Sequence, residues 1–302
     1  MNRAGGSPDG QVLPGESLAI RYLNFVKLPH TLFALPFALL GLVAASRQGP
    51  VTPRLVGLAV LAFTSARWVG LGFNMISDRY WDQLNPRNQR RELPRGALTL
   101  HQAWLSVLIA AAIFLVTAAA INRLCGILAP VALVWVMTYS YAKRFTNWPH
   151  LWLGMSLAIA PVGGWLAIAG HWSDPWWALL SVTVGVATWV AGFDIFYALP
   201  DEAFDRLHGL HSVVARFGVR QSIVIARILH GITIPALAAF GAGVGFGGWY
   251  FTGVAAAALI LLCEHSLVRA DDLSLLGAAF FTMNAVMSST LFGFALLDRL
   301  TH

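Results

Sequence analysis

The sequence predicts an all-α membrane protein, and two observations support that fold class. Hydrophobic residues make up 57% of the 302 residues and charged residues only 11%, whereas ordinary soluble domains have about 45–50% and about 25%. Apolar segments of roughly twenty residues also follow one another along the chain, and each could cross a ~30 Å hydrocarbon core as a helix. These continuous apolar segments differ from the alternating strands of a membrane barrel.

In chain order, the first segment is a polar tail, residues 1–20, which is rich in Gly and Pro. It lacks the apolar stretch directly behind a basic start that marks a signal peptide, so we expect a disordered cytoplasmic tail. Residues 21–302 are expected to form a single transmembrane domain, a bundle of about nine helices. The expected spans are 29–46, 54–76, 100–121, 124–142, 149–170, 175–198, 219–241, 246–264 and 273–297.

The basic residues predict the orientation of this bundle. If nine spans alternate in direction, fourteen of the 20 Lys and Arg residues share a side with the N-terminus, four lie on the other side and two lie inside spans. This asymmetry predicts a multi-pass protein of the cytoplasmic (inner) membrane, with the N-terminus and the loops 77–99 and 199–218 in the cytoplasm. The net charge of +6 therefore indicates orientation and anionic partners in the lipid bilayer, and no nucleic acid.

Two sets of polar residues stand at four-residue steps at the cytoplasmic ends of the second and sixth spans: Asn74, Asp78 and Asp82, and then Tyr197, Asp201 and Asp205. Residues four apart on a helix face the same way. Because like charges at that spacing repel, each set favours a bound cation. Carboxylate oxygens suit Mg²⁺, which often shares its ligands with substrate phosphates. Either set alone could be a solvated helix end, but two sets on one side of the membrane favour a metal site.

Basic residues surround both acidic sets. Arg79 lies inside the first, and Lys143 and Arg144 come from the loop between the two. Carboxylates and cations gathered at one membrane face suit a metal-bridged polyanion. A diphosphate whose lipid tail runs into the bundle has this chemistry.

The two acidic motifs and the stretch Tyr141–Thr146 resemble the UbiA superfamily of intramembrane prenyltransferases, and the resemblance covers roughly residues 20–297. Three further segments resemble the 4-hydroxybenzoate-polyprenyltransferase-like branch: Leu28–Phe37, Arg91–Gly96 and Gly209–Gly218. Within that branch, the match is closest to the enzymes assigned to the futalosine route to menaquinone.

The resemblance implies Mg²⁺-dependent transfer of a polyprenyl group from its diphosphate to a small aromatic acid, of the 4-hydroxybenzoate or naphthoate type, in ubiquinone or menaquinone biosynthesis. It implies no obligate protein partner. The implied Mg²⁺ ligands are Asn74, Asp78, Asp82, Asp201 and Asp205. The implied diphosphate contacts are Lys27, Arg79, Lys143 and Arg144, and the implied catalytic residues are Asp78, Asp201 and Tyr197. The metal would act as Lewis acid and the cations would stabilise charge on the leaving group, while Tyr197 could face the allylic cation.

Other residues have two interpretations that the sequence leaves open. Arg67 lies deep in the second span, where a charge is costly and normally faces the bundle interior. It could anchor the carboxylate of an acceptor or pair with a structural partner such as Asp194. Asn24, His30 and Thr31 could line an acceptor pocket, according to the resemblance, although a single His near a span end is more often only hydrogen-bonded.

Three local features carry further expectations. His208 and His211 are expected to stabilise their loop, because oxygen-rich Mg²⁺ sites seldom use imidazole. Pro200 stands where the resemblance leads us to expect a polar residue, and it should break or kink the end of the sixth span. Gly163-Gly164 is expected to be a site of close helix packing.

The main alternative from a different functional class is a transporter, which usually has its charged residues near the bilayer midplane on broken helices. CDP-alcohol phosphotransferases also bind Mg²⁺ in membranes, but they have one compact Asp-rich motif. Within the superfamily, prenylation of haem O, chlorophyll or homogentisate precursors remains open.

Overall fold

The computed structural model describes residues 13–277 and 282–301, and the side chains of 28–33 lie outside the description. In chain order the long helices are α2 (Leu28–Ala45), α3 (Pro53–Leu84), α4 (Leu100–Ile121), α5 (Arg123–Thr138), α6 (Pro149–Ala169), α7 (Trp177–Ala198), α9 (Val213–Gly243), α10 (Gly248–Leu267) and α11 (Asn284–Thr301). Two short helices, α1 (Leu18–Phe25) and α8 (Glu202–Leu207), and two 3-10 turns, Tyr139–Arg144 and Leu199–Asp201, complete the described elements. The predicted all-α class is confirmed.

Seven described helices are long and apolar enough to cross a membrane, namely α3, α4, α5 with its 3-10 extension, α6, α7 continued through α8, α9 and α10. A shorter apolar segment, Ala34–Ala45, belongs to α2. The last predicted span, 273–297, includes residues 278–281 outside the described ranges, and α11 follows them. Of the predicted tail, residues 1–12 are not described and residues 18–20 form the first turn of α1.

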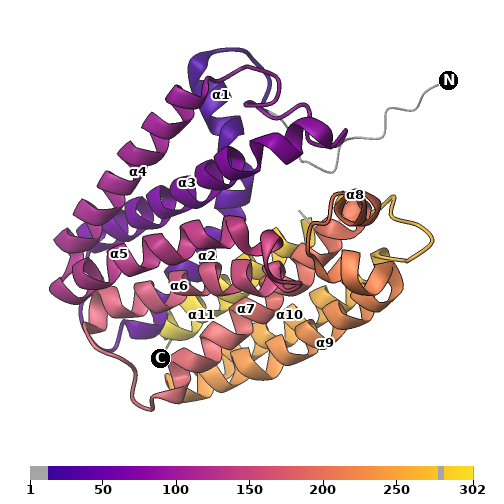
Figure 1. The fold of residues 1–302 in the computed structure, drawn as a ribbon. Helices are drawn as coiled ribbons and strands as arrows, with labels where there is room; N and C mark the ends of the chain where they lie inside the picture. Colours follow the sequence, from indigo (N-terminus) through magenta and orange to yellow (C-terminus); the bar gives the residue numbers. More distant parts are fainter. Residues whose placement is uncertain (1–12, 278–281, 302) are drawn as a thin grey trace.

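The bundle is organised around α6, which packs on α2 on one side and on α7 on the other (Figure 1). Buried Trp189, Phe240 and Tyr250 belong to a large apolar core that joins α7, α9 and α10 with α2, α6 and α11. A separate core between α1, α3 and α4 contains Phe25 and Val69. The space between these two cores therefore lies among α3, α6 and α7.

Helix α6 approaches α2 closely because Gly164 faces its backbone. A Cβ atom on Gly164 would collide with the carbonyl oxygen of Ala38, whereas one on Gly163 would meet nothing within 4 Å. The expected close packing is thus confirmed for Gly164. In a membrane, where lipid is as apolar as Leu, such close contact is a main source of helix association.

Helix α3 begins at a favourable N-terminus and runs well past its apolar segment. Thr52 caps the helix by accepting a hydrogen bond from the Leu55 amide, and Pro53 occupies the first turn, where its missing N–H costs nothing. The helix then continues for 32 residues, to Leu84. The whole first acidic motif consequently lies on a regular helix.

Helix α7 ends just before Pro200, as predicted. The chain turns through a 3-10 segment, Leu199–Asp201, and resumes as α8. Proline cannot donate the hydrogen bond that would continue the helix. The second acidic motif is therefore distributed over α7, the 3-10 turn and α8.

Candidate active site

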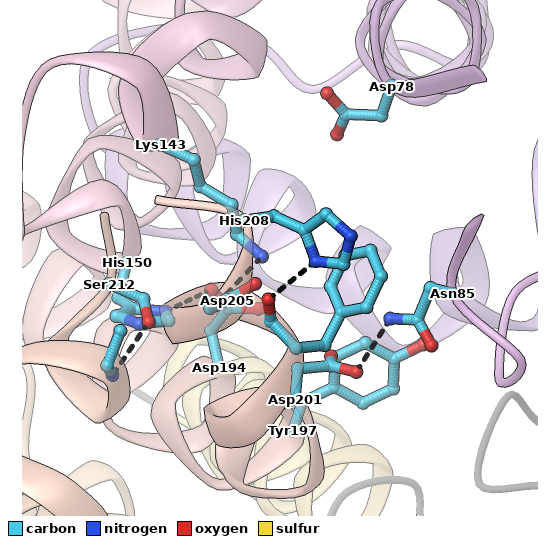
Figure 2. Close-up of polar contacts among 12 residues, drawn as sticks. Asp78, Asn85, Lys143, His150, Asp194, Tyr197, Asp201, Asp205, His208 and Ser212 are labelled. Atoms are coloured by element: carbon cyan, nitrogen blue, oxygen red, sulfur yellow. Dashed lines mark hydrogen bonds and ion pairs between the residues drawn. The ribbon is translucent and has the colours of Figure 1, made fainter. Parts of the chain in front are cut away.

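Both acidic motifs open onto one cavity at the end of the bundle where α3 and α7 finish. The cavity is lined from α3, from the 3-10 turn after α5, from α6, and from α7 with α8. Figure 2 shows Asp78 on one side of this space, with Lys143, Asp201 and Asp205 on the other. The predicted residues that line the cavity are Lys27, Asn74, Asp78, Asp82, Lys143, Arg144, Tyr197, Asp201 and Asp205. Two motifs more than a hundred residues apart in sequence thus meet, as the sequence predicted.

On the α3 side, the three motif residues have different partners. Asn74 donates a hydrogen bond to Asp78 Oδ2 at 2.9 Å. Asp82 is buried and accepts from Arg91 Nη1 at both oxygens, at 2.8 and 2.9 Å, and from Asn88 at 3.0 Å. The loop after α3 therefore folds back and compensates the charge of the buried Asp82 carboxylate.

On the α7 side, Asp201 is held by the same loop. Arg87 Nη1 donates to Asp201 Oδ2 at 2.7 Å, and Asn85 donates to the other oxygen at 3.1 Å. Arg87 also donates to the carbonyl oxygen of Tyr197 at 3.0 Å, and its guanidinium lies over that ring at 4.2 Å. The Tyr197 hydroxyl accepts from Lys27 Nζ at 3.2 Å. Tyr197 is accordingly fixed between two cations.

Lys143 and Asp205 form the third charged pair. Lys143 Nζ lies 4.0 Å from Asp205 Oδ2, and Asp205 is almost fully buried. That Asp205 oxygen makes no hydrogen bond within the described part of the chain. The adjacent Arg144 is exposed and donates to the carbonyl and hydroxyl oxygens of Ser77 at 3.0 and 3.1 Å. Lys143 thus stands between the two acidic motifs, and Arg144 at the rim.

The structure does not bring every predicted residue to this cavity. Arg79 is absent from its lining and donates to the carbonyl oxygen of Ile76 at 3.2 Å. The reason is helical geometry, since consecutive residues point about 100° apart and Asp78 already faces the cavity. Asn24 also lies elsewhere, bonded to the backbone of Leu13. The side chains of His30 and Thr31 are outside the description.

The two loop histidines have structural contacts, as expected. His208 Nδ1 lies 2.9 Å from the carbonyl oxygen of Phe204, and its ring stacks beside that of Phe204. His211 Nδ1 lies 3.1 Å from Asn147 Oδ1. Neither histidine lines the cavity.

Sequence reasoning missed the partners of the acidic residues and one further pair. The sequence did not predict the ion pairs of Arg87 and Arg91, nor the contact at 2.7 Å between buried His150 and half-buried Asp194. The density of arginines directly after the first motif was the available signal for the ion pairs. The His150–Asp194 pair joins residues 44 apart and had no such signal.

Arg67 is half-buried at the inner end of the cavity, which Tyr139 also lines. At this point a second cavity begins, which is almost entirely apolar and lies among α2, α3, α4, α5 and α6. The residues common to both cavities are Arg67, Leu71, Tyr139, Leu153 and Leu157. The charged chamber therefore leads directly into an apolar one.

The site combines many charges without a preformed metal cluster. In the described ranges no three His, Cys, Asp or Glu side chains converge on one point. The carboxylates instead line the cavity wall, and cations pair with Asp82, Asp201 and Asp205. Such a wall suits a ligand that contributes charged groups of both signs.

Comparison with known proteins identifies related chains over most of this length. A model of the UbiA prenyltransferase family matches residues 34–286. The 4-hydroxybenzoate octaprenyltransferase of Aromatoleum aromaticum is 28% identical over 270 residues, covering 88% of this chain and 90% of the relative. The enzyme of the same name from Vibrio cholerae is 29% identical over 240 residues, covering 79% and 83%.

Solved structures show the same fold. A UbiA homologue from Aeropyrum pernix, determined in its apo form, is 29% identical with a TM-score of 0.79, covering 87% of this chain and 96% of that one. A UbiA homologue from Archaeoglobus fulgidus, solved with DMAPP and Mg²⁺, has a TM-score of 0.71 at 21% identity, covering 93% of this chain and 100% of the other.

Proposed function

Because the chain belongs to the UbiA prenyltransferase family, we propose that it transfers a polyprenyl group from a polyprenyl diphosphate to a small aromatic acid in quinone biosynthesis, with Mg²⁺ as cofactor. The acceptor is of the 4-hydroxybenzoate or naphthoate type. The names of the sequence relatives support such an acceptor, and the homologue solved with DMAPP and Mg²⁺ supports the donor and the metal. Family membership also argues against the transporter alternative.

One observation carries the proposal. Two acidic motifs face each other across a single cavity, and Lys143 stands between them. A prenyl diphosphate has the matching composition, since its phosphates require cations and its tail requires an apolar environment. The apolar cavity that begins beside Arg67 and Tyr139 would hold the tail.

The oxygen-bearing side chains of the two acidic motifs fit Mg²⁺ as ligands. The residues that would hold it are Asn74, Asp78, Asp82, Asp201 and Asp205, which present oxygen ligands. Asp205 Oδ2 is buried without a hydrogen bond among the described residues, and a carboxylate oxygen that already accepts from Arg keeps a further lone pair. Because no three acids converge in advance, the geometry suits ions that take their remaining ligands from phosphate and water, as Mg²⁺ usually does.

Bound Mg²⁺ would supply Lewis-acid stabilisation of the departing diphosphate. Lys143 and Lys27, with Arg144 at the rim, would contact the non-bridging oxygens and stabilise the charge that develops as the allylic C–O bond breaks. Arg79 is not included, because it lies outside the cavity lining.

The acceptor would bind at the inner end of the chamber. Arg67 is a half-buried cation there, and a bidentate contact to the acceptor carboxylate would fix the aromatic ring. The ring of Tyr197, which already lies beside two cations, would face the allylic cation and attract it through its π system. Burial of the chamber would keep that cation from water.

The basic loops around the cavity support an orientation with this chamber at the cytoplasmic face of the inner membrane and the N-terminus in the cytoplasm. The aromatic acid would then enter the chamber from the cytoplasm, where it is dissolved, and the diphosphate group of the donor would bind at the same face. The polyprenyl tail would remain in the bilayer.

The test is prenyl incorporation in membranes that contain Asp78→Ala or Asp201→Ala, measured with a labelled polyprenyl diphosphate and each aromatic acid, with and without Mg²⁺. Both variants should lose transfer while still inserting into the membrane. Asp271→Ala removes an exposed carboxylate distant in sequence from both motifs and serves as the matched control. Normal turnover in either motif variant would refute the metal-bridge mechanism.

A further inference from the structure

A buried histidine and a carboxylate form a pair inside the proposed reaction chamber. His150 is the second residue of α6, and Asp194 lies one turn before the end of α7. The distance between His150 Nδ1 and Asp194 Oδ2 is 2.7 Å. Figure 2 shows the two side chains next to each other on the Lys143 side of the chamber.

Among the described residues, the second ring nitrogen of His150 has no hydrogen-bond partner. The side chain is 1% exposed, and Nε2 is buried without a hydrogen bond to any described residue. Buried polar atoms in native proteins are usually bonded, so such an atom requires an explanation. Because His150 and Asp194 both line the cavity that contains Arg67 and Tyr139, the explanation can be a bound substrate.

We propose that His150 is the general base that accepts the aromatic ring proton during prenyl transfer, with Asp194 as the residue that positions it. This inference rests on the proposed function, and it adds a proton acceptor that belongs to neither acidic motif. The geometric basis is threefold: the His150–Asp194 pair, the position of both residues in the lining of the chamber, and an Nε2 atom that makes no hydrogen bond to any described residue.

The proposed reaction has three steps: ionisation of the prenyl diphosphate, attack by the aromatic ring and loss of the ring proton. The allylic C–O bond of the donor breaks and its electron pair leaves with diphosphate. The acceptor ring then forms the new C–C bond and becomes an arenium cation. His150 Nε2 takes the proton from the same ring carbon, and the C–H electron pair restores aromaticity. The resulting imidazolium is stabilised by Asp194, and its proton passes to the departing diphosphate or to water.

Three other acids of the chamber already have a cation as partner. Asp82 and Asp201 each accept hydrogen bonds from an arginine, and Asp205 lies beside Lys143. In Asp82 and Asp201, both carboxylate oxygens already accept hydrogen bonds from the loop after α3. His150 instead has a carboxylate as its neighbour, an arrangement that fixes the tautomer with Nδ1–H and leaves Nε2 as acceptor.

The test uses His150→Asn, which can still donate toward Asp194 but lacks Nε2. Transfer should fall by about 10²–10⁴-fold, the usual contribution of a positioned base. With an acceptor deuterated at the ring carbon that is prenylated, a primary isotope effect should appear in the variant and be absent or smaller in the wild type. Binding of the prenyl diphosphate with Mg²⁺ should be unchanged. His208→Asn, in the adjacent loop, is the matched control.

Asp194→Asn provides a second variant. An amide can donate to Nδ1 and so move the ring proton to Nε2, which would impair the base while leaving the site occupied. Reduced transfer with the same isotope effect would support the positioning role of Asp194.

The outcomes separate the two proposals. If the wild type prenylates no aromatic acid, the proposed function fails. If the wild type transfers but His150→Asn retains its rate, or loses transfer without an isotope effect and together with diphosphate binding, His150 is structural and the inference is overturned.

Discussion

The ion pair between Arg87 and Asp201 provides a quantitative test of how the site is held together. Arg87 Nη1 lies 2.7 Å from Asp201 Oδ2, and the two side chains are only 11% and 13% exposed. Replacing Arg87 with Met keeps much of the apolar stem but removes the cation. Asp201 would then remain largely buried with Asn85 as its other hydrogen-bond donor.

The expected cost follows from that burial. Breaking a buried pair by removing one partner costs about 3–5 kcal/mol, and the residual solvent contact lowers the cost for this pair to about 2–3 kcal/mol. Because 1 kcal/mol shifts the unfolding temperature of a chain of this size by roughly 2–4 °C, Arg87→Met should lower Tm by roughly 5–10 °C.

The assay is thermal unfolding of the purified protein in detergent without Mg²⁺. Arg90→Met, three residues along the same loop at an exposed position, is the matched control and should change Tm little. In a cycle with Asp201→Asn, the two changes should be coupled by more than about 1 kcal/mol. Equal Tm values for the Arg87 and Arg90 variants, or independent effects in the cycle, would refute the reasoning.

Three further predictions follow from particular contacts. Lys143→Met should reduce transfer by about 10²–10³-fold, the scale of one lost hydrogen-bond donor to developing charge. Arg144→Met should reduce transfer less, because that side chain is exposed. Steady-state kinetics in membranes measures both rates. Arg67→Met should raise KM for the aromatic acid while leaving KM for the diphosphate unchanged, and equal changes in both would contradict its assignment. Gly164→Val should lower the yield of folded protein by separating α6 from α2, whereas Gly163→Val should not, as size-exclusion chromatography of each variant can establish.

The sequence predicted the parts of the site that depend on local spacing. The four-residue steps of Asn74 and Asp78 place both on one face because α3 is regular through Leu84. Pro200 predicted the break after α7, because the effect of a proline on the backbone is local. The apolar length of the spans could likewise be read from short segments.

The rest depended on contacts between distant segments. Arg87 reaches Asp201 across 114 residues, and His150 reaches Asp194 across 44. Nothing in the spacing of these residues distinguishes them from the other basic or polar residues nearby. Arg79 is the opposite case, a predicted contact that the structure does not show. Its position inside the first motif led us to expect it in the cavity, but its angle on the helix directs it to the carbonyl oxygen of Ile76.

The most direct test of the account is equilibrium binding of a non-hydrolysable polyprenyl thiolodiphosphate to the purified protein, measured by calorimetry with and without Mg²⁺. We expect binding by the wild type only when Mg²⁺ is present, and loss of that metal-dependent binding in both Asp78→Asn and Asp201→Asn. Binding that is independent of Mg²⁺, or undiminished in either variant, would contradict the central claim that the two motifs hold one metal–diphosphate ligand between them.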